Sequence, residues 1–280
     1  MSRWQKLGII AGGSALPFTI AAAAKARGED IFFIRLKGMA DPSLNDFPGV
    51  DCALGEAGKI IRSLKEAKCD AVILAGMVQR PEFKSLKVDW RGAAILPRLA
   101  SAAAKGDGAL LDLLVKTFEA EGFIVIGVDE AVQGLTAPHG AIGKNVPTSE
   151  NLSDVKKAAS IINALGPYDV GQGAVVANGL VLAIEAAEGT DAMLDRCIQL
   201  PNGIQSGGVL VKRPKPGQEL RVDLPVIGIE TIKRAAAAGL SGIAIEASVA
   251  LIIDRNEVVT LADQSGIFVY GFDPRDLQEA

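Results

Sequence analysis

The stretch Leu7-Gly-Ile-Ile-Ala-Gly-Gly-Ser-Ala-Leu-Pro-Phe-Thr-Ile-Ala-Ala-Ala-Ala-Lys-Ala-Arg-Gly28 decides the fold of this 280-residue chain. Leu7–Ala11 is short and apolar, which is typical of a buried strand, and the turn residues Gly12–Ser14 interrupt it. The alanine-rich segment Ala15–Arg27 then predicts a helix that ends at Gly28. A buried strand that runs directly into a helix is the first half of a βαβ unit.

The same alternation continues through the first half of the chain. Strands are expected at Asp30–Leu36, Ala71–Leu74 and Phe123–Val128, and helices at Lys59–Ala67 and from Asp107, as its cap, to about Glu121. Apolar strands alternating with helices indicate a parallel, doubly wound sheet. The first half is therefore expected to be an α/β domain.

The pattern changes at a polar, turn-rich stretch that begins near Ala137. We place a linker at residues 138–150, an N-terminal domain at 1–137 and a C-terminal domain at 151–280. The C-terminal half predicts helices at Asn151–Leu165, Asp191–Gln199 and Thr231–Ala238, and strands at Val170–Ala177, Val181–Glu185, Gly207–Val211, Gly242–Glu246, Ala250–Ile253 and Ile267–Tyr270. Asn178-Gly179 marks a hairpin between two of these strands, so this domain is expected to hold a mixed α/β sheet.

Composition narrows the class of protein. Hydrophobic residues make up 49% of the chain but aromatic residues only 5%, so the core must consist mainly of Ala, Val, Ile and Leu. Cys52, Cys69 and Cys197 have no paired spacing, which predicts buried thiols in a reducing compartment. With no signal peptide and no long apolar run, a cytoplasmic location is expected. The net charge of −4 argues against nucleic acid as the main partner.

A basic loop follows the strand at Gly207–Val211. Lys212, Arg213, Lys215 and Arg221 lie close together in sequence and are followed by Asp223. Such a cluster in an acidic chain suggests a site for a phosphate or diphosphate, with Asp223 to hold a metal or position a water. The alternative is a solvated, proline-stiffened hairpin.

Turn residues after the N-terminal strands are candidates for ligand contact. Gly12 and Gly13 follow the first strand, and Gly76 and Arg80 follow a later one, at the edge of the sheet where open α/β folds place ligands. Glycine allows close approach of a phosphate or sugar, and Arg80 can bind an anion. A plain tight turn and a surface ion pair explain the same residues equally well.

The C-terminal half carries further polar candidates. Thr190 and Asp191 stand at a helix start, where Asp191 is either a cap or an oxygen ligand for Mg²⁺ or Mn²⁺. Gln172 precedes an apolar strand and either binds a base or sugar or serves a turn. His139 is the only histidine, and no nucleophile-elbow pattern accompanies it, so a serine or cysteine triad is excluded.

Taken together, the motifs closely resemble those of the LpxI family, the UDP-2,3-diacylglucosamine pyrophosphatases of lipid A synthesis. The matching segments are Gly8-Ile-Ile-Ala-Gly-Gly-Ser-Ala-Leu-Pro, Gln79-Arg-Pro, Lys105-Gly-Asp, Glu185-Ala-Ala-Glu-Gly-Thr-Asp, Val211-Lys-Arg-Pro-Lys-Pro-Gly-Gln and Arg221-Val-Asp-Leu-Pro-Val-Ile-Gly. Ser14 stands where the family commonly has Gly. The likeness spans almost the whole chain.

The resemblance implies a Rossmann-like N-terminal domain, a distinctive C-terminal domain and a lipid substrate held between them. It also implies a divalent metal, hydrolysis to UMP and 2,3-diacylglucosamine 1-phosphate, and a catalytic role for Asp223. In this reading Lys212, Lys215 and Arg221 offset phosphate charge, while Asp191 and Asp223 hold Mg²⁺ or Mn²⁺.

The expected partners follow from this substrate. We expect transient peripheral contact with the inner membrane, and the sequence leaves homo-oligomerisation open. Two alternative functions stay open. One is a nucleotide-sugar transferase that uses the N-terminal sheet for its cofactor; the other is a non-catalytic sensor of a phosphorylated metabolite, which uses the same basic loop but does not need Asp223 or Asp191.

Overall fold

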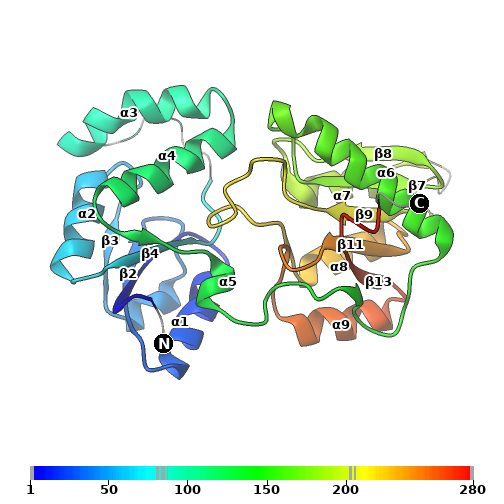
Figure 1. Ribbon diagram of the computed structural model, residues 1–280, viewed down its shortest axis with the longest axis horizontal. Coiled ribbons are helices and arrows are strands. Elements are labelled where there is room, and N and C mark those ends of the chain that lie inside the picture. Colours follow the sequence, from blue (N-terminus) through cyan, green and yellow to red (C-terminus); the bar gives the residue numbers. More distant parts are fainter. Residues whose placement is uncertain are drawn as a thin grey trace. The chain divides into compact units, whose positions relative to one another are not determined.

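The computed structural model describes residues 3–79, 82, 86, 88–201, 204 and 206–277. The chain forms two compact units, Met1–Gln133 and Gly134–Ala280 (Figure 1). Both are α/β, the first with a parallel sheet and the second with a mixed sheet, as the sequence predicts.

The first unit contains a five-stranded sheet in the order β3-β2-β1-β4-β5. Its strands are β1 (Lys6–Ala11), β2 (Asp30–Leu36), β3 (Gly49–Cys52), β4 (Ala71–Ala75) and β5 (Ile124–Val125), and all neighbours are parallel. The strand order reverses between β1 and β4. Open α/β sheets bind ligands at such a switch point, outside the carboxyl ends of the strands.

The strands are connected by the helices α1 (Leu16–Ala26), α2 (Ala57–Glu66), α3 (Trp90–Ala103) and α4 (Asp107–Ala120) and by a short 3₁₀ helix at Pro42–Asp46, and α5 (Val128–Ala131) follows the last strand. Asp89 fixes the start of α3, because its carboxylate accepts hydrogen bonds from the Gly92 amide at 2.7 Å and the Lys59 amide at 2.9 Å. One carboxylate thus joins the first turns of α2 and α3.

The second unit contains a six-stranded sheet in the order β6-β13-β11-β9-β7-β8. The strands are β6 (Gly140–Ala141), β7 (Gly173–Ala177), β8 (Leu180–Ile184), β9 (Val209–Lys212), β11 (Gly242–Glu246) and β13 (Phe268–Phe272). The three central strands β13, β11 and β9 are parallel, whereas β6, β7 and β8 pair antiparallel with their neighbours. β10 (Val226–Ile227) and β12 (Leu251–Ile252) form a separate two-stranded parallel sheet.

Helices cover both faces of the six-stranded sheet (Figure 1). α6 (Ser149–Leu165) packs on β7 and β9 through Val155, Ala158 and Ile162. On the other face, α7 (Gly189–Ile198), α8 (Ile229–Ala237) and α9 (Arg255–Gln264) pack around Leu210, Ile243 and Ile245. The side chains of each strand alternate between these two cores, as in any sheet buried on both faces.

The hairpin predicted at Asn178-Gly179 joins β7 and β8. Its amides donate to the carboxylate of Asp154 on α6, at 2.8 Å from Asn178 and 2.7 Å from Gly179. The hairpin is therefore fastened to the helix that covers its sheet. All three cysteines are buried and unpaired. Among the described residues, no helix has the length and apolar character needed to span a membrane.

Candidate functional site

Lys212 is the last residue of β9, and its side chain is buried, with 6% of its surface exposed. The ammonium Nζ donates to Oγ1 of Thr190 at 2.7 Å and to the carbonyl of Val226 at 3.2 Å. Thr190 lies in the first turn of α7, so this contact joins the end of a strand to the start of a helix. The structure therefore brings together two of the residues predicted from sequence.

Opposing electrostatic effects act on Lys212. Burial lowers the pKa of its ammonium from the ordinary 10.5, while the carboxylates of Glu185, Asp191 and Asp223 act in the opposite direction. A buried cation that faces several acids is typical of a functional site, although structural ion pairs also produce such shifts. Glu185 begins one of the family-like motifs but is not among the site residues predicted from the sequence, and the structure adds it to this group.

The cations of the basic loop after β9 have acidic partners. Arg213 Nε lies 3.0 Å from Oε2 of Glu246 at the end of β11, and the Arg213 amide donates to the Gln172 carbonyl at 3.0 Å. Lys215 Nζ pairs with Oδ1 of Asp169. The loop is thus an ordered, ion-paired structure, in contrast to a freely solvated hairpin.

Arg221 lies near the end of the same loop. Its guanidinium Nη2 contacts Oε2 of Glu219 at 2.6 Å, and its side chain is 34% exposed. Arg221 is therefore the most exposed of the predicted phosphate-binding cations Lys212, Lys215 and Arg221.

Gln218 closes the loop, and sequence reasoning missed it. Its Oε1 accepts from the Lys215 amide at 2.8 Å, and its Nε2 donates to the Asp223 carbonyl. Gly217 makes the turn before it, with a φ of +77° that L side chains rarely adopt. The Gln218 side chain therefore links Lys215 to Asp223. The only signal of this role in the sequence is Pro216-Gly217-Gln218, which indicates a turn.

Asp223 is partly buried and accepts a hydrogen bond on Oδ1 from Gln172 Nε2 at 3.1 Å. Burial raises the pKa of the Asp223 carboxyl above the ordinary 3.8, while Lys215, Gln172 and Lys212 act to lower it and Asp169 to raise it. The other amide atom of Gln172, Oε1, is buried and has no hydrogen-bond partner in the described part of the chain. Gln172, just before β7, and Asp223, at the end of the basic loop, thus form one polar group.

Asp191 occupies a different environment. Its carboxylate is 56% exposed, and its Oδ2 lies 3.6 Å from Nε of Arg234 on α8. Arg234 also pairs with Asp195 one turn later on α7. Asp191 therefore shares a cation between α7 and α8 and lies close enough to act on Lys212.

The oxygen atoms around Asp223 can be compared with the ligands that a divalent cation requires. Within the described ranges, no group of three or more His, Cys, Asp or Glu side chains is placed to hold a metal ion. Mg²⁺ commonly binds one or two carboxylates together with substrate phosphates and keeps several waters. Asp223, with the unpartnered Oε1 of Gln172 beside it, fits a cation that shares its ligands with a phosphate. These oxygens do not form a closed protein cage.

The glycines of the first unit meet at the carboxyl ends of β1 and β4. The Gly12 amide donates to the Ala75 carbonyl at 2.9 Å, and Gly13 exchanges two backbone hydrogen bonds with Met77, at 2.8 and 2.7 Å. A Cβ at Gly12 would lie 2.4 Å from the Met77 oxygen, and one at Gly76 would lie 2.3 Å from the Gly13 oxygen. Their close approach to each other explains these glycines, and the amides of Gly12 and Gly13 are already used. Arg80 lies outside the described residues.

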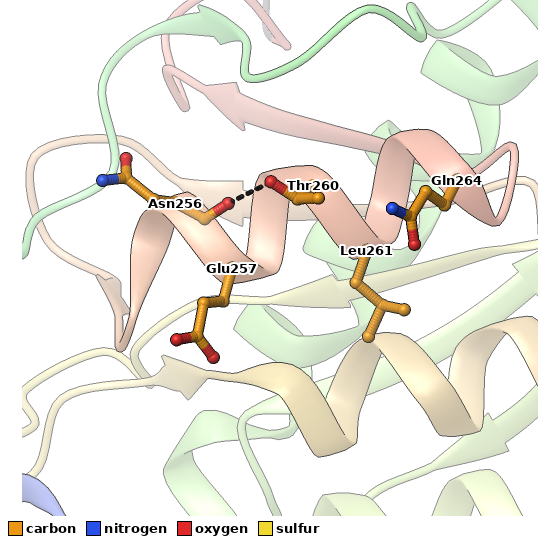
Figure 2. Close-up of a pocket in the computed structure, with 5 residues that line it drawn as sticks. All are labelled: Asn256, Glu257, Thr260, Leu261 and Gln264. Carbon is orange, nitrogen blue, oxygen red and sulfur yellow. Dashed lines mark hydrogen bonds between the residues drawn. The ribbon is translucent and has the colours of Figure 1, made fainter.

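A shallow depression lies elsewhere in the second unit, along α9. It is lined by Asn256, Glu257, Thr260, Leu261 and Gln264, as Figure 2 shows. The Thr260 hydroxyl is occupied locally, since it donates to the Asn256 carbonyl at 2.7 Å. This depression shares no residue with the group around Lys212 and Asp223.

Comparison with known proteins gives two concordant results. Models of the LpxI N-terminal and C-terminal domains match residues 6–135 and 138–270, respectively. The chain is also 49% identical over 277 residues to a Caulobacter vibrioides protein named UDP-2,3-diacylglucosamine pyrophosphatase LpxI, covering 97% of this chain and 99% of that protein. The similarity thus includes both units.

Proposed function

The chain belongs to the LpxI family, and from this premise we propose that it hydrolyses the diphosphate of UDP-2,3-diacylglucosamine. The products would be UMP and 2,3-diacylglucosamine 1-phosphate, and the reaction would be a step of lipid A biosynthesis. The observation that carries the proposal is the 49% identity, over nearly the full length of both chains, to a relative of that name. Lys212, Thr190, Gln172 and Asp223 supply a cation, a hydroxyl group, an amide and a carboxylate, which are groups suited to diphosphate hydrolysis.

The proposed mechanism begins with charge. Water adds across the P–O–P linkage: its oxygen bonds to one phosphorus, the bridging oxygen leaves with the other, and a proton is released. Negative charge grows on the phosphoryl oxygens during attack, so cations fixed in advance stabilise the transition state. Lys212, Lys215 and Arg221 are the proposed cations, and the Thr190 hydroxyl is a proposed donor to phosphate.

Asp223 is the proposed catalytic residue. A partly buried carboxylate with a raised pKa accepts a proton more readily than an exposed one, which suits it to orient and deprotonate the attacking water. Gln172 holds one of its oxygens in place. Asp223 and Asp191 are also the residues that would hold the proposed cofactor, Mg²⁺ or Mn²⁺, which when bound would polarise the phosphoryl oxygens.

Two further parts of the proposal concern membrane contact and substrate contacts in the first unit. The substrate is an amphiphile with two acyl chains, so the enzyme would contact the inner membrane transiently at its cytoplasmic face. Gly12, Gly13, Gly76 and Arg80 remain proposed substrate contacts of the N-terminal unit. Because the Gly12 and Gly13 amides are already bonded, any contact there would use other atoms.

The direct test is to incubate the purified chain with UDP-2,3-diacylglucosamine and Mg²⁺, and to measure UMP by chromatography and the lipid product by mass spectrometry. We expect UMP to form, EDTA to abolish its formation and excess Mg²⁺ to restore it. Substrate that stays intact with Mg²⁺ present would overturn the proposed reaction.

The role of Asp223 is tested in the same assay. Asp223→Ala is expected to lower kcat by about 10²–10³-fold, and Asp46→Ala, which removes an exposed acid of the first unit, is the matched control. Near-normal turnover by folded Asp223→Ala would exclude the catalytic role. If both wild type and variant bind the substrate without cleaving it, the chain is a sensor instead.

A further inference from the structure

A row of three residues crosses the sheet of the second unit at the site. Gly173 on β7 is opposite Lys212 on β9, and the Glu185 amide, just after β8, donates to the Gly173 carbonyl at 2.8 Å. Residues directly opposite each other on antiparallel strands project their side chains to the same face. Glu185 and Lys212 therefore lie on the same face, with only a glycine between them.

Gly173 leaves the space that Glu185 fills. A Cβ at Gly173 would lie 2.4 Å from Oε2 of Glu185, closer than real side-chain atoms approach. Gly171 makes room in the same way, since a Cβ there would lie 2.1 Å from the Glu185 carbonyl oxygen. The Gly171-Gln172-Gly173 segment, which ends at the first residue of β7, thus forms a recess in which the Glu185 carboxylate lies over Gly173, on the same face as Lys212.

Both ends of this row are buried. Glu185 is 8% exposed and Lys212 is 6% exposed. Oε2 of Glu185 is buried and has no hydrogen-bond partner among the described residues, so no hydrogen bond offsets the burial of this oxygen. A buried charge without hydrogen bonds is stable only beside a charge of opposite sign. Lys212 supplies that charge, and Glu185 is foremost among the acids that act on it.

We infer that Glu185 is a positioning residue, which holds the Lys212 ammonium at the Thr190 hydroxyl from across Gly173. Because Thr190 Oγ1 accepts a hydrogen bond from Lys212, its own proton is directed to another acceptor, and a phosphate oxygen is such an acceptor. Glu185 thereby acts on phosphate through Lys212 and Thr190 without touching it. The assignment of phosphate as that acceptor rests on the proposed function.

A stability double-mutant cycle tests the pair without any substrate. Glu185→Gln removes the acid that acts most on Lys212, and Lys212→Met leaves the Glu185 charge without its cation. Each single change therefore loses the attraction between the two side chains, which the urea midpoint measures. In the double variant neither charge remains, and the loss should be clearly smaller than the sum of the single losses. Glu150→Gln, an exposed change on α6, should add to Lys212→Met without coupling. Additive losses for Glu185 and Lys212 would overturn the inference.

The kinetic arm uses the same variants. Glu185→Gln should lower kcat/KM by about 10²-fold through misplacement of Lys212, whereas the double variant should be no slower than Lys212→Met alone. Glu185→Asp, which keeps the charge on a shorter side chain, should recover part of the loss. If Glu185→Gln slows the Lys212→Met enzyme as much as the wild type, Glu185 does not act through Lys212.

The two arms separate this inference from the proposed function. Coupling in the urea experiment together with absence of UMP from the wild type would overturn the proposed reaction and leave the pair intact. Formation of UMP with additive urea losses would do the reverse. Should Lys212→Met fail to fold, Lys212→Gln, which retains a donor for Thr190, completes the same cycle.

Discussion

At the scale of single residues, the second unit concentrates charges at places where burial opposes them. Lys212 is buried although burial lowers the pKa of its ammonium, and Asp223 is partly buried although burial raises the pKa of its carboxyl. Each of these charged forms therefore costs folding free energy in exchange for a fixed position. Such a cost is common where charge serves binding or catalysis, because function and stability then favour different side chains.

Asp223→Asn is expected to stabilise the fold as it removes activity. The pKa of Asp223 is raised in the folded state, so its ionisation destabilises that state as pH rises above the ordinary value of 3.8. The difference in unfolding free energy between Asn variant and wild type should be near zero below that pH. It should grow as pH rises toward the folded pKa and stay constant above it.

Urea unfolding of both proteins between acid and neutral pH measures this difference. Asp46→Asn, which removes an exposed carboxylate, should show no comparable trend. A variant less stable than wild type at neutral pH would mean that the hydrogen bond from Gln172, together with the nearby lysines, outweighs burial in the folded protein.

At the scale of elements, local sequence signals predicted the long, periodic segments well. α1, α6 and the β7–β8 hairpin are found where apolar pattern, glycine stops and Asn178-Gly179 placed them. α3 was missed because Gly92 and Pro97 interrupt its sequence. In the structure the Asp89 carboxylate caps α3 at the Gly92 amide and also accepts a hydrogen bond from Lys59 on α2. The contact with α2 is invisible to any local pattern.

Short elements at sheet edges were the other failures. β3 has only the residues Gly49–Cys52, with a polar Asp51 among them, and no run of apolar residues marks it. The strand expected at Phe123–Val128 is confined to Ile124–Val125, since α5 begins at Val128. Asp107 was expected to cap α4, but Gly106 holds that position with a φ of +134°, and Asp107 lies in the first turn.

The turn after β1 allows a prediction about its two glycines. Gly12→Ala should destabilise the chain by about 1–3 kcal/mol, the usual cost of overpacking, because its Cβ would meet the Met77 oxygen at 2.4 Å. Gly13→Ala is the matched control: its nearest contact would be the Met39 oxygen at 3.3 Å, which a small shift relieves. The midpoint temperature of thermal unfolding should therefore be clearly lower for Gly12→Ala than for Gly13→Ala. The reverse order would show that the loops are not held together by their close approach.

At the scale of the whole molecule, the site could be predicted as a set of residues but not as a network. The sequence singled out Lys212, Lys215 and Asp223 because charge is concentrated in one loop. It could not reveal that Asp169 pairs with Lys215 or that Gln172 donates to Asp223, since strand register decides which distant residues meet. Glu185 could not be predicted as a site residue for the same reason, because its proposed role depends on Gly173, the glycine opposite it on the neighbouring strand.

The second unit should fold alone only if the fragment begins early enough to include β6. The buried cores of the second unit are built from residues between Ala137 and Phe272, so we expect fragment 134–280 to fold alone. Fragment 151–280, which starts at the domain boundary predicted from sequence, lacks β6 together with the buried Ala137 and Ile142. Loss of one buried Ile side chain alone costs about 2–5 kcal/mol, and the edge of β13 loses its partner strand.

Circular dichroism and urea unfolding of the two fragments test this expectation. Fragment 134–280 should unfold cooperatively, and fragment 151–280 should unfold at a clearly lower urea concentration or be only partly folded. Equal midpoints would show that β6 contributes nothing to the second unit and that residues 138–150 act as a linker. A fragment 134–280 without cooperative unfolding would instead mean that the second unit depends on the first for its stability, because its own buried cores would then be insufficient.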